Sequence, residues 1–275
     1  MELEGQIQRF RERGLSVAAL SYDSQAILKD FATRRKISFP LLSDPESKVI
    51  RAFGIENEAE YPAGHLAHGV PYPGTFVADR SAIVTAKYFE KAYAERQSAA
   101  SLLTLAGERP EALVSEMTTP TFAVRTSSSN ASAAPGQRIT LALDFEMKPA
   151  MHAYAPGAHG YRPLRVRLDP HALATAQDAV FPPSTTYRFV PLDETAPVFE
   201  GRFRVTQDVT LAGGREFAEL LKTPEPVVDL VGTLEYQVCS DAVCYPPASL
   251  PLRWSIKVIP LDRERSPEAI QHRQR

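Results

Sequence analysis

Prolines divide this chain into two parts that call for different architectures. Five of the 23 prolines lie in the first 106 residues, and the other eighteen follow. Proline fixes its own φ angle and lacks a backbone N–H, so it is confined to turns, helix starts and strand edges. We therefore expect helices in the first part and short strands with proline-containing turns in the second. A length of 275 residues is enough for two such domains.

The first part, residues 1–106, has the pattern of an α/β domain. Leu15–Leu20 is a short apolar run typical of a buried strand, and Ser24 can cap a helix that follows it. Asp44 stands at the expected start of another helix. Thr75–Ala78 and Ile83–Phe89 predict a hairpin. Helices that alternate with strands indicate an α/β unit.

The second part has the pattern of an all-β domain. Residues 107–120 read as a linker, and residues 121–261 contain short apolar segments separated by breaks rich in Pro, Gly and Ser. Within them Arg138–Phe145 alternates apolar and polar residues, as a half-buried strand requires. This pattern favours a β-sandwich. Residues 262–275 form a charged tail that we expect to fray.

Composition excludes several functions. With 31 basic and 33 acidic residues the formal charge is −2, which gives no field for nucleic acid. No apolar stretch approaches the ~20 residues of a membrane-spanning helix. His65 and His68 have no carboxylate or cysteine at ligand spacing, so we expect no metal site. The sequence has no phosphate loop or dinucleotide fingerprint, so we expect no cofactor.

The strongest candidate for chemistry is the segment Tyr236–Pro247, which contains both cysteines of the chain, Cys239 and Cys244. A tight loop there could bring the two sulfurs together for thiol–disulfide exchange. The alternative is a structural disulfide or two buried thiols, and spacing alone favours that alternative. Asp241 lies between the cysteines and would disfavour a thiolate.

The first part resembles the redoxin family of peroxiredoxins and alkyl hydroperoxide reductases, which has a thioredoxin-like fold. The matching text is Val17–Asp23, Phe39–Asp44 and Gly69–Val77. In that family the proline before the Thr-Phe strand is usually cis and packs against the redox centre. The resemblance implies that role for Pro73, since an X–Pro bond is where a cis peptide costs least.

The first part of the chain lacks the reactive cysteine of the redoxin family. That cysteine begins the family's first long helix, whereas this chain opens within that helix at Met1–Glu4 and has no cysteine before Cys239. The domain is therefore either truncated or a non-catalytic remnant. We favour truncation, because a redoxin without its central strand leaves an open slot with unpaired backbone groups. We expect no peroxidase activity from this chain.

The second part resembles the N-terminal domain of the thiol:disulfide interchange protein DsbD, an immunoglobulin-like sandwich. The matching text is Tyr236–Cys239, Cys244–Pro247, His152–Tyr154 and Phe199–Gly201. In that family the cysteine pair cycles between dithiol and disulfide, and a loop with an aromatic residue covers it. The resemblance implies Tyr154 and Phe199 as shielding aromatics.

Together these observations predict a truncated thioredoxin-like domain followed by an immunoglobulin-like sandwich. The predicted function is thiol–disulfide exchange with a partner protein through Cys239 and Cys244. The alternative is a non-catalytic interaction module in which the same pair is a structural disulfide. The resemblance of the sandwich points outside the cytoplasm, whereas Met1–Glu4 carries acids where an export signal has basic residues.

Overall fold

The chain divides into two compact units, and each is described by itself. The first unit comprises Met1–Leu103 with Leu261–Arg275, and the second comprises Thr104–Pro260. No helix in the described part of the chain is long and apolar enough to cross a membrane. The computed structural model describes residues 2–65, 68–89, 95–110, 112–189, 194–213, 215–261 and 264–270.

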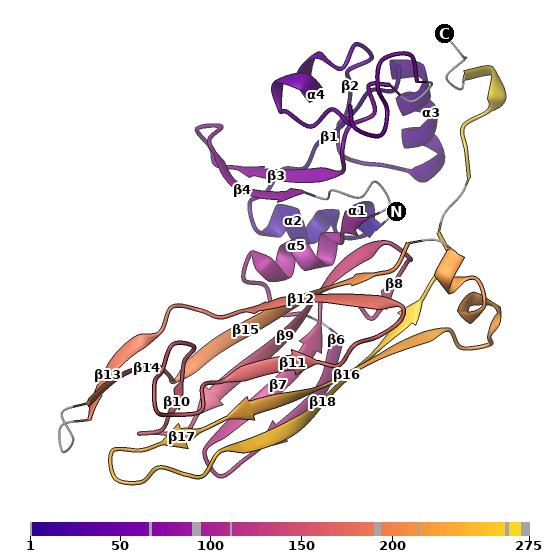
Figure 1. Ribbon diagram of the computed structural model, residues 1–275. Coiled ribbons are helices and arrows are strands. Elements are labelled where there is room, and N and C mark those ends of the chain that lie inside the picture. Colours follow the sequence, from indigo (N-terminus) through magenta and orange to yellow (C-terminus); the bar gives the residue numbers. More distant parts are fainter. Residues whose placement is uncertain are drawn as a thin grey trace. The chain divides into compact units, whose positions relative to one another are not determined.

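The first unit combines short helices with two small sheets (Figure 1). Strands β1 and β2 pair in parallel, and β3 and β4 pair as an antiparallel hairpin. Among the described residues these pairs remain separate two-stranded sheets. The elements are α1 (Glu2–Gly5), α2 (Ile7–Glu12), β1 (Ala19–Ser21), α3 (Gln25–Arg35), β2 (Leu41–Ser43), α4 (Lys48–Ala52), β3 (Gly74–Ala78), β4 (Val84–Phe89), β5 (Arg96–Gln97) and α5 (Ala99–Leu105).

Local capping explains where two of the helices begin. The Ser24 hydroxyl accepts a hydrogen bond from the Ile27 N–H at 3.4 Å and caps α3. The Asp44 carboxylate accepts hydrogen bonds at 2.9 Å from three successive backbone N–H groups, those of residues 48–50, at the start of α4. These contacts satisfy N–H groups that the helix itself leaves free. The predicted helix starts near both residues are confirmed.

Two predictions for the first unit are wrong. Strand β1 is half-buried, because β2 is its only strand neighbour among the described residues. The peptide bond before Pro73 is trans. The Tyr72 N–H just before it donates to the Ile55 carbonyl at 2.7 Å and holds an extended segment that leads into β3. A trans bond continues this extended course and is the lower-energy form of an X–Pro peptide.

The expected tail, residues 262–275, is described only over residues 264–270, and there it contacts α3. The Glu264 carboxylate pairs with Arg34 at 2.8 Å and with Arg35 at 2.7 Å. The second guanidinium nitrogen of Arg34 donates to the Ser266 hydroxyl at 3.3 Å. A short 3₁₀ helix, η4 (Glu268–Ile270), follows. The charged composition of the tail predicts a solvated segment, but the charge of Glu264 has partners on α3.

The second unit is an immunoglobulin-like sandwich (Figure 1). One sheet has the strand order β12-β15-β9-β7-β6, a second has β11-β16-β18-β8, and a third has β13-β14-β10-β17. Its elements are β6 (Ala112–Thr118), β7 (Phe122–Ser128), β8 (Ser132–Ala133), β9 (Gln137–Met147), β10 (His152–Tyr154), β11 (Arg165–Leu168), β12 (Ala174–Val180), β13 (Thr185–Phe189), β14 (Glu194–Glu200), β15 (Arg202–Leu211), η2 (Arg215–Phe217), η3 (Leu220–Lys222), β16 (Val227–Tyr236), β17 (Val238–Cys239) and β18 (Ala248–Val258).

The segment predicted as a linker, residues 107–120, contains a strand. Half of it is β6, which pairs antiparallel with β7 at the end of its sheet. An edge strand buries less apolar surface than a central one, so its sequence shows weaker alternation. Composition alone therefore did not distinguish this strand from a connection.

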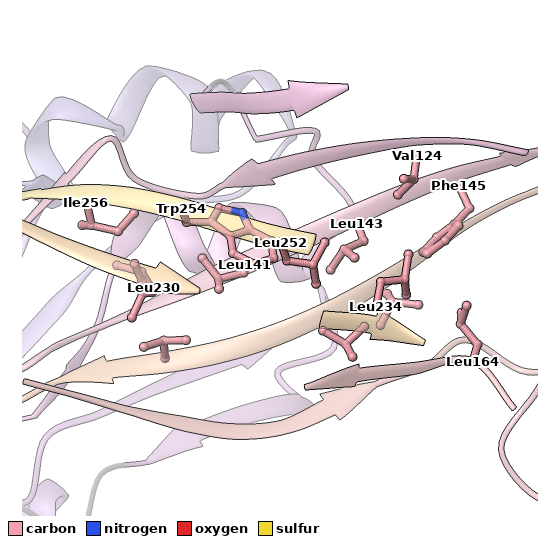
Figure 2. Close-up of a cluster of buried hydrophobic side chains, with 14 of the residues drawn as sticks. Val124, Leu141, Leu143, Phe145, Leu164, Leu230, Leu234, Leu252, Trp254 and Ile256 are labelled. Atoms are coloured by element: carbon pink, nitrogen blue, oxygen red, sulfur yellow. The ribbon is translucent and has the colours of Figure 1, made fainter. Parts of the chain in front are cut away.

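The core of the sandwich lies between the sheets. The predicted alternation in β9 is confirmed, because Ile139, Leu141, Leu143 and Phe145 are all buried on one face. Figure 2 shows Leu141 and Leu143 of β9 beside Leu252 and Trp254 of β18. Trp254 is 0% exposed, and its indole N–H donates to the Ser127 carbonyl at 3.1 Å.

Candidate functional site

The two cysteines face each other across a tight hairpin. Cys239 ends β17, and Cys244 forms an antiparallel bridge with it. The Tyr245 N–H donates to the Val238 carbonyl at 3.0 Å, and the Ser240 N–H donates to the Val243 carbonyl at 2.8 Å. The cysteines therefore occupy a non-hydrogen-bonded pair, the site at which antiparallel side chains come closest.

A disulfide joins Cys239 and Cys244, whose Cα atoms are 4.0 Å apart. The turn between them has its own support, since the Ser240 hydroxyl accepts hydrogen bonds from the Ala242 N–H at 3.2 Å and from the Val243 N–H at 3.0 Å. A serine that bonds to the backbone two and three residues ahead is a common way to stabilise a turn. The local sequence thus holds the hairpin in shape.

The two sulfur-bearing residues differ strongly in exposure. Cys239 is 1% exposed, and it pairs through β17 with His152 on β10. Cys244 is exposed, and the apolar side chains on either side of it, Val243 and Tyr245, are 54% and 38% exposed. A molecule in solution can therefore approach the pair at Cys244, while Cys239 lies beneath the surface.

Tyr154 lies directly against the disulfide. Its hydroxyl donates to Cys239 Sγ at 3.2 Å and lies 3.8 Å from Cys244 Sγ. The side chain is buried, and this burial raises the pKa of the Tyr154 phenol above its ordinary value. The hydroxyl therefore keeps its proton at neutral pH and remains a hydrogen-bond donor. The structure places this predicted site residue beside both sulfurs.

Phe199, the other aromatic residue predicted to shield the pair, lies on the opposite face of the sheet. On β14 it pairs with Ala153, whereas its neighbour Val198 pairs with Tyr154. Side chains alternate between faces along a strand, so Val198 belongs to the cluster around Cys239 and Phe199 enters the main core. The expectation that Phe199 shields the disulfide is wrong, because the pairing register turns its side chain away.

Two tyrosines that sequence reasoning missed complete the site. Tyr161 stacks on Tyr154 with ring centroids 4.0 Å apart, and its hydroxyl donates to Glu194 at 2.7 Å. Tyr187 donates to the Asp241 carboxylate at 2.6 Å, which ties β13 to the turn between the cysteines. This hydrogen bond, with burial adding to it, raises the pKa of Tyr187 to about 12.

Tyr187 could have been found only from the pairing of β13 with β14, because it is distant from the cysteines in sequence. Tyr161 follows the matched segment His152–Tyr154 by a few residues, so its position in the loop after β10 was the available signal. Asp241, expected to oppose a thiolate, accepts the Tyr187 hydrogen bond.

The histidines expected to bind no metal are separate from this site. His68 lies with its Nδ1 atom 2.9 Å from the Tyr61 carbonyl oxygen. Among the described residues, no group of three or more His, Cys, Asp or Glu side chains is arranged to hold a metal ion.

The fold and this site define a two-domain chain that joins an α/β unit to a sandwich with a surface disulfide. Residues 1–87 match the AhpC/TSA family, and residues 120–250 match the N-terminal domain of the thiol:disulfide interchange protein DsbD. The resemblances predicted from the sequence are thus confirmed. A redoxin-type segment and a DsbD-type domain with a disulfide-forming pair fit thiol–disulfide exchange.

Similar proteins match parts of the chain. Two proteins of Mycobacterium tuberculosis named for the peroxiredoxin class, from strains CDC 1551 / Oshkosh and H37Rv, are each 38% identical over 84 residues, which is 30% of this chain. The chain spans about half of their length, 52%.

Two solved structures are also similar to the chain. One is the N-terminal periplasmic domain of ScsB from Proteus mirabilis, with a TM-score of 0.34 and 14% identity, covering 53% of this chain and 50% of that one. The other is the reduced N-terminal domain of Neisseria meningitidis DsbD, with a TM-score of 0.29 and 18% identity, covering 42% and 77%.

Proposed function

We propose that this chain exchanges thiols and disulfides with a partner protein through Cys239 and Cys244. The observation that carries the proposal is the asymmetry of the pair. Cys244 is exposed, whereas Cys239 is buried with the Tyr154 hydroxyl 3.2 Å from its sulfur. An exchange reaction needs one sulfur that can be attacked and one that can leave with negative charge.

The exchange would begin when a partner thiolate attacks Cys244 Sγ. A bond forms between the partner sulfur and Cys244, the bond from Cys244 to Cys239 breaks, and Cys239 leaves as a thiolate. The Tyr154 hydroxyl then donates a hydrogen bond to a charged sulfur, which is stronger than one to a neutral acceptor. A second partner thiol releases Cys244, and two electrons have passed to the pair. The reverse sequence reduces a partner disulfide.

The alternative, a purely structural disulfide, has less support from the local geometry. The bond closes a loop with a sequence separation of only 5. In the chain-entropy treatment a loop of this size contributes about 2 kcal/mol, less than the longer loops of structural disulfides. The turn is also held by hydrogen bonds of Ser240 and Tyr245. The exposed Cys244 is an unfavourable place for a bond that must resist reduction.

The reduction potential of the pair tests the proposal. We expect a value above about −250 mV for the full chain in an equilibrium titration against glutathione with mass-spectrometric detection, because working exchange couples lie in that range. A value below about −300 mV is typical of structural disulfides and would contradict the proposed function.

Tyr154→Phe is expected to slow reduction of the disulfide. The substitution keeps the ring and removes the donor to the Cys239 sulfur. A hydrogen bond to a charged group contributes about 1.5 kcal/mol or more, so we expect reduction by dithiothreitol to become about tenfold slower. Tyr72→Phe is the matched control, because Tyr72 lies in the first unit, where its ring packs against Phe89. Equal rates for the wild type and Tyr154→Phe would exclude the proposed role of the hydroxyl.

A further inference from the structure

A buried histidine lies across from the buried cysteine. His152 on β10 is the register partner of Cys239 on β17, so both side chains project from the same face of the sheet. His152 is 1% exposed. Its Nε2 atom is buried and has no hydrogen-bond partner in the part of the chain that the structure describes. Buried polar atoms of native proteins nearly always have a partner, so this nitrogen calls for an explanation.

The His152 ring packs against two aromatic side chains. The Tyr187 ring lies 4.1 Å from it between centroids, and the Tyr154 ring meets it edge-on at 5.7 Å. Glu200 on β14 is its other register partner, and Asp241 after β17 contributes a second negative charge. Two aromatic rings thus fix the orientation of the imidazole next to the strand that carries Cys239.

The redox state of Cys239 changes what the His152 ring can bind. In a disulfide, Cys239 carries no proton, whereas reduction gives it a thiol S–H. A neutral imidazole has one nitrogen that accepts a hydrogen bond. Reduction therefore creates a donor on the face of the sheet from which His152 also projects. That donor must lose its proton before the Cys239 sulfur can attack again, because the thiolate is the nucleophile.

We propose that His152 accepts the proton of the Cys239 thiol during the second step of the exchange, in which Cys239 resolves the mixed disulfide. This inference rests on the proposed exchange function. The bond between Cys239 Sγ and Cys244 Sγ forms, and the bond between Cys244 Sγ and the partner sulfur breaks. The partner leaves as a thiolate with the bonding electron pair. The proton passes to His152 and from there to solvent.

The pH dependence of this step follows from the environment of the ring. Burial lowers the pKa of His152 below its ordinary value, and the negative charges of Glu200 and Asp241 oppose this shift. The ring is therefore neutral near pH 7 and able to accept a proton. Below the lowered pKa it is protonated, so the resolving step should slow as the pH falls through that value.

Dithiodipyridine, a small disulfide that remains usable at acidic pH, separates the two steps on the reduced full chain. Attack by Cys244 releases one thiopyridone, and resolution by Cys239 releases another. An ordinary thiol with a pKa of about 8.5 is only about 3% ionised at pH 7. We expect His152→Gln to slow the second release about tenfold at pH 7 and to leave the first release unchanged. The two proteins should converge at alkaline pH, where the thiol ionises unaided.

His159→Gln is the matched control, since His159 is an exposed histidine in the loop that follows β10. An unchanged second release in His152→Gln, or slowing by the same factor at every pH, would overturn the inference while leaving the exchange function intact. If the wild type gives no second release, the exchange function itself fails. If His152→Gln does not fold, the wild type still tests the inference. A rate of second release that does not fall below pH 6.5 would contradict a histidine acceptor.

Discussion

Cys244→Ser should abolish reaction of the reduced chain with a disulfide probe, whereas Cys239→Ser should stop the reaction halfway. Cys244 is exposed and Cys239 is 1% exposed, so the probe reaches only the former sulfur. Serine cannot form the mixed disulfide, and Cys244→Ser therefore lacks the first step. In Cys239→Ser the first step proceeds, but no thiol remains to resolve the product.

The measurement is the amount of thiopyridone released, together with the mass of the protein after the reaction. Cys239→Ser should carry a stable adduct, and the wild type should carry none. A partner protein could be trapped by the same variant. If the two variants behave alike, the asymmetry of the pair has no chemical consequence, and the order of attack proposed above is wrong.

Trp254→Ala should have the largest effect on the stability of the sandwich. The side chain is 0% exposed and packs between the sheets, as Figure 2 shows. Truncation of a large buried aromatic residue costs about 3–5 kcal/mol through lost burial and the cavity left behind. The Ser127 carbonyl also loses its indole donor.

Urea unfolding followed by circular dichroism measures this loss, because Trp254 is the single tryptophan of the chain and its replacement removes the fluorescence signal. Val231→Ala, on the neighbouring strand β16, is the control. Its side chain is 44% exposed, so we expect a change within about 0.5 kcal/mol. A loss for Trp254→Ala no greater than that of the control would show that the core tolerates the cavity.

The sequence predicted features that depend on neighbouring residues. The alternation within β9 identified its buried face, and Ser24 and Asp44 marked helix starts through contacts three to six residues ahead. Features that depend on pairing between distant strands could not be predicted in this way. The edge strand β6 has the sequence pattern of a linker, because its pairing with the separate strand β7 supplies its hydrogen bonds.

The candidate site also has features that the local sequence predicts and features that depend on pairing between distant strands. Cys239 and Cys244 face each other through a local turn, and the sequence predicted that they could meet. Tyr154 and Phe199 could not be distinguished, because only the register of β10 with β14 determines which of them faces the sulfurs. Tyr187 reaches Asp241 across a sequence separation of 54, which no local pattern reveals.

The pairing of Glu264 with Arg34 and Arg35 has a consequence for how the protein is made. The first compact unit is assembled from two segments of the chain, and the whole sandwich lies between them in sequence. A ribosome adds about 5–20 residues per second, and domains generally fold as they emerge. Helix α3 therefore lacks its acidic partner until the whole sandwich has been synthesised, and the sandwich has the opportunity to fold first.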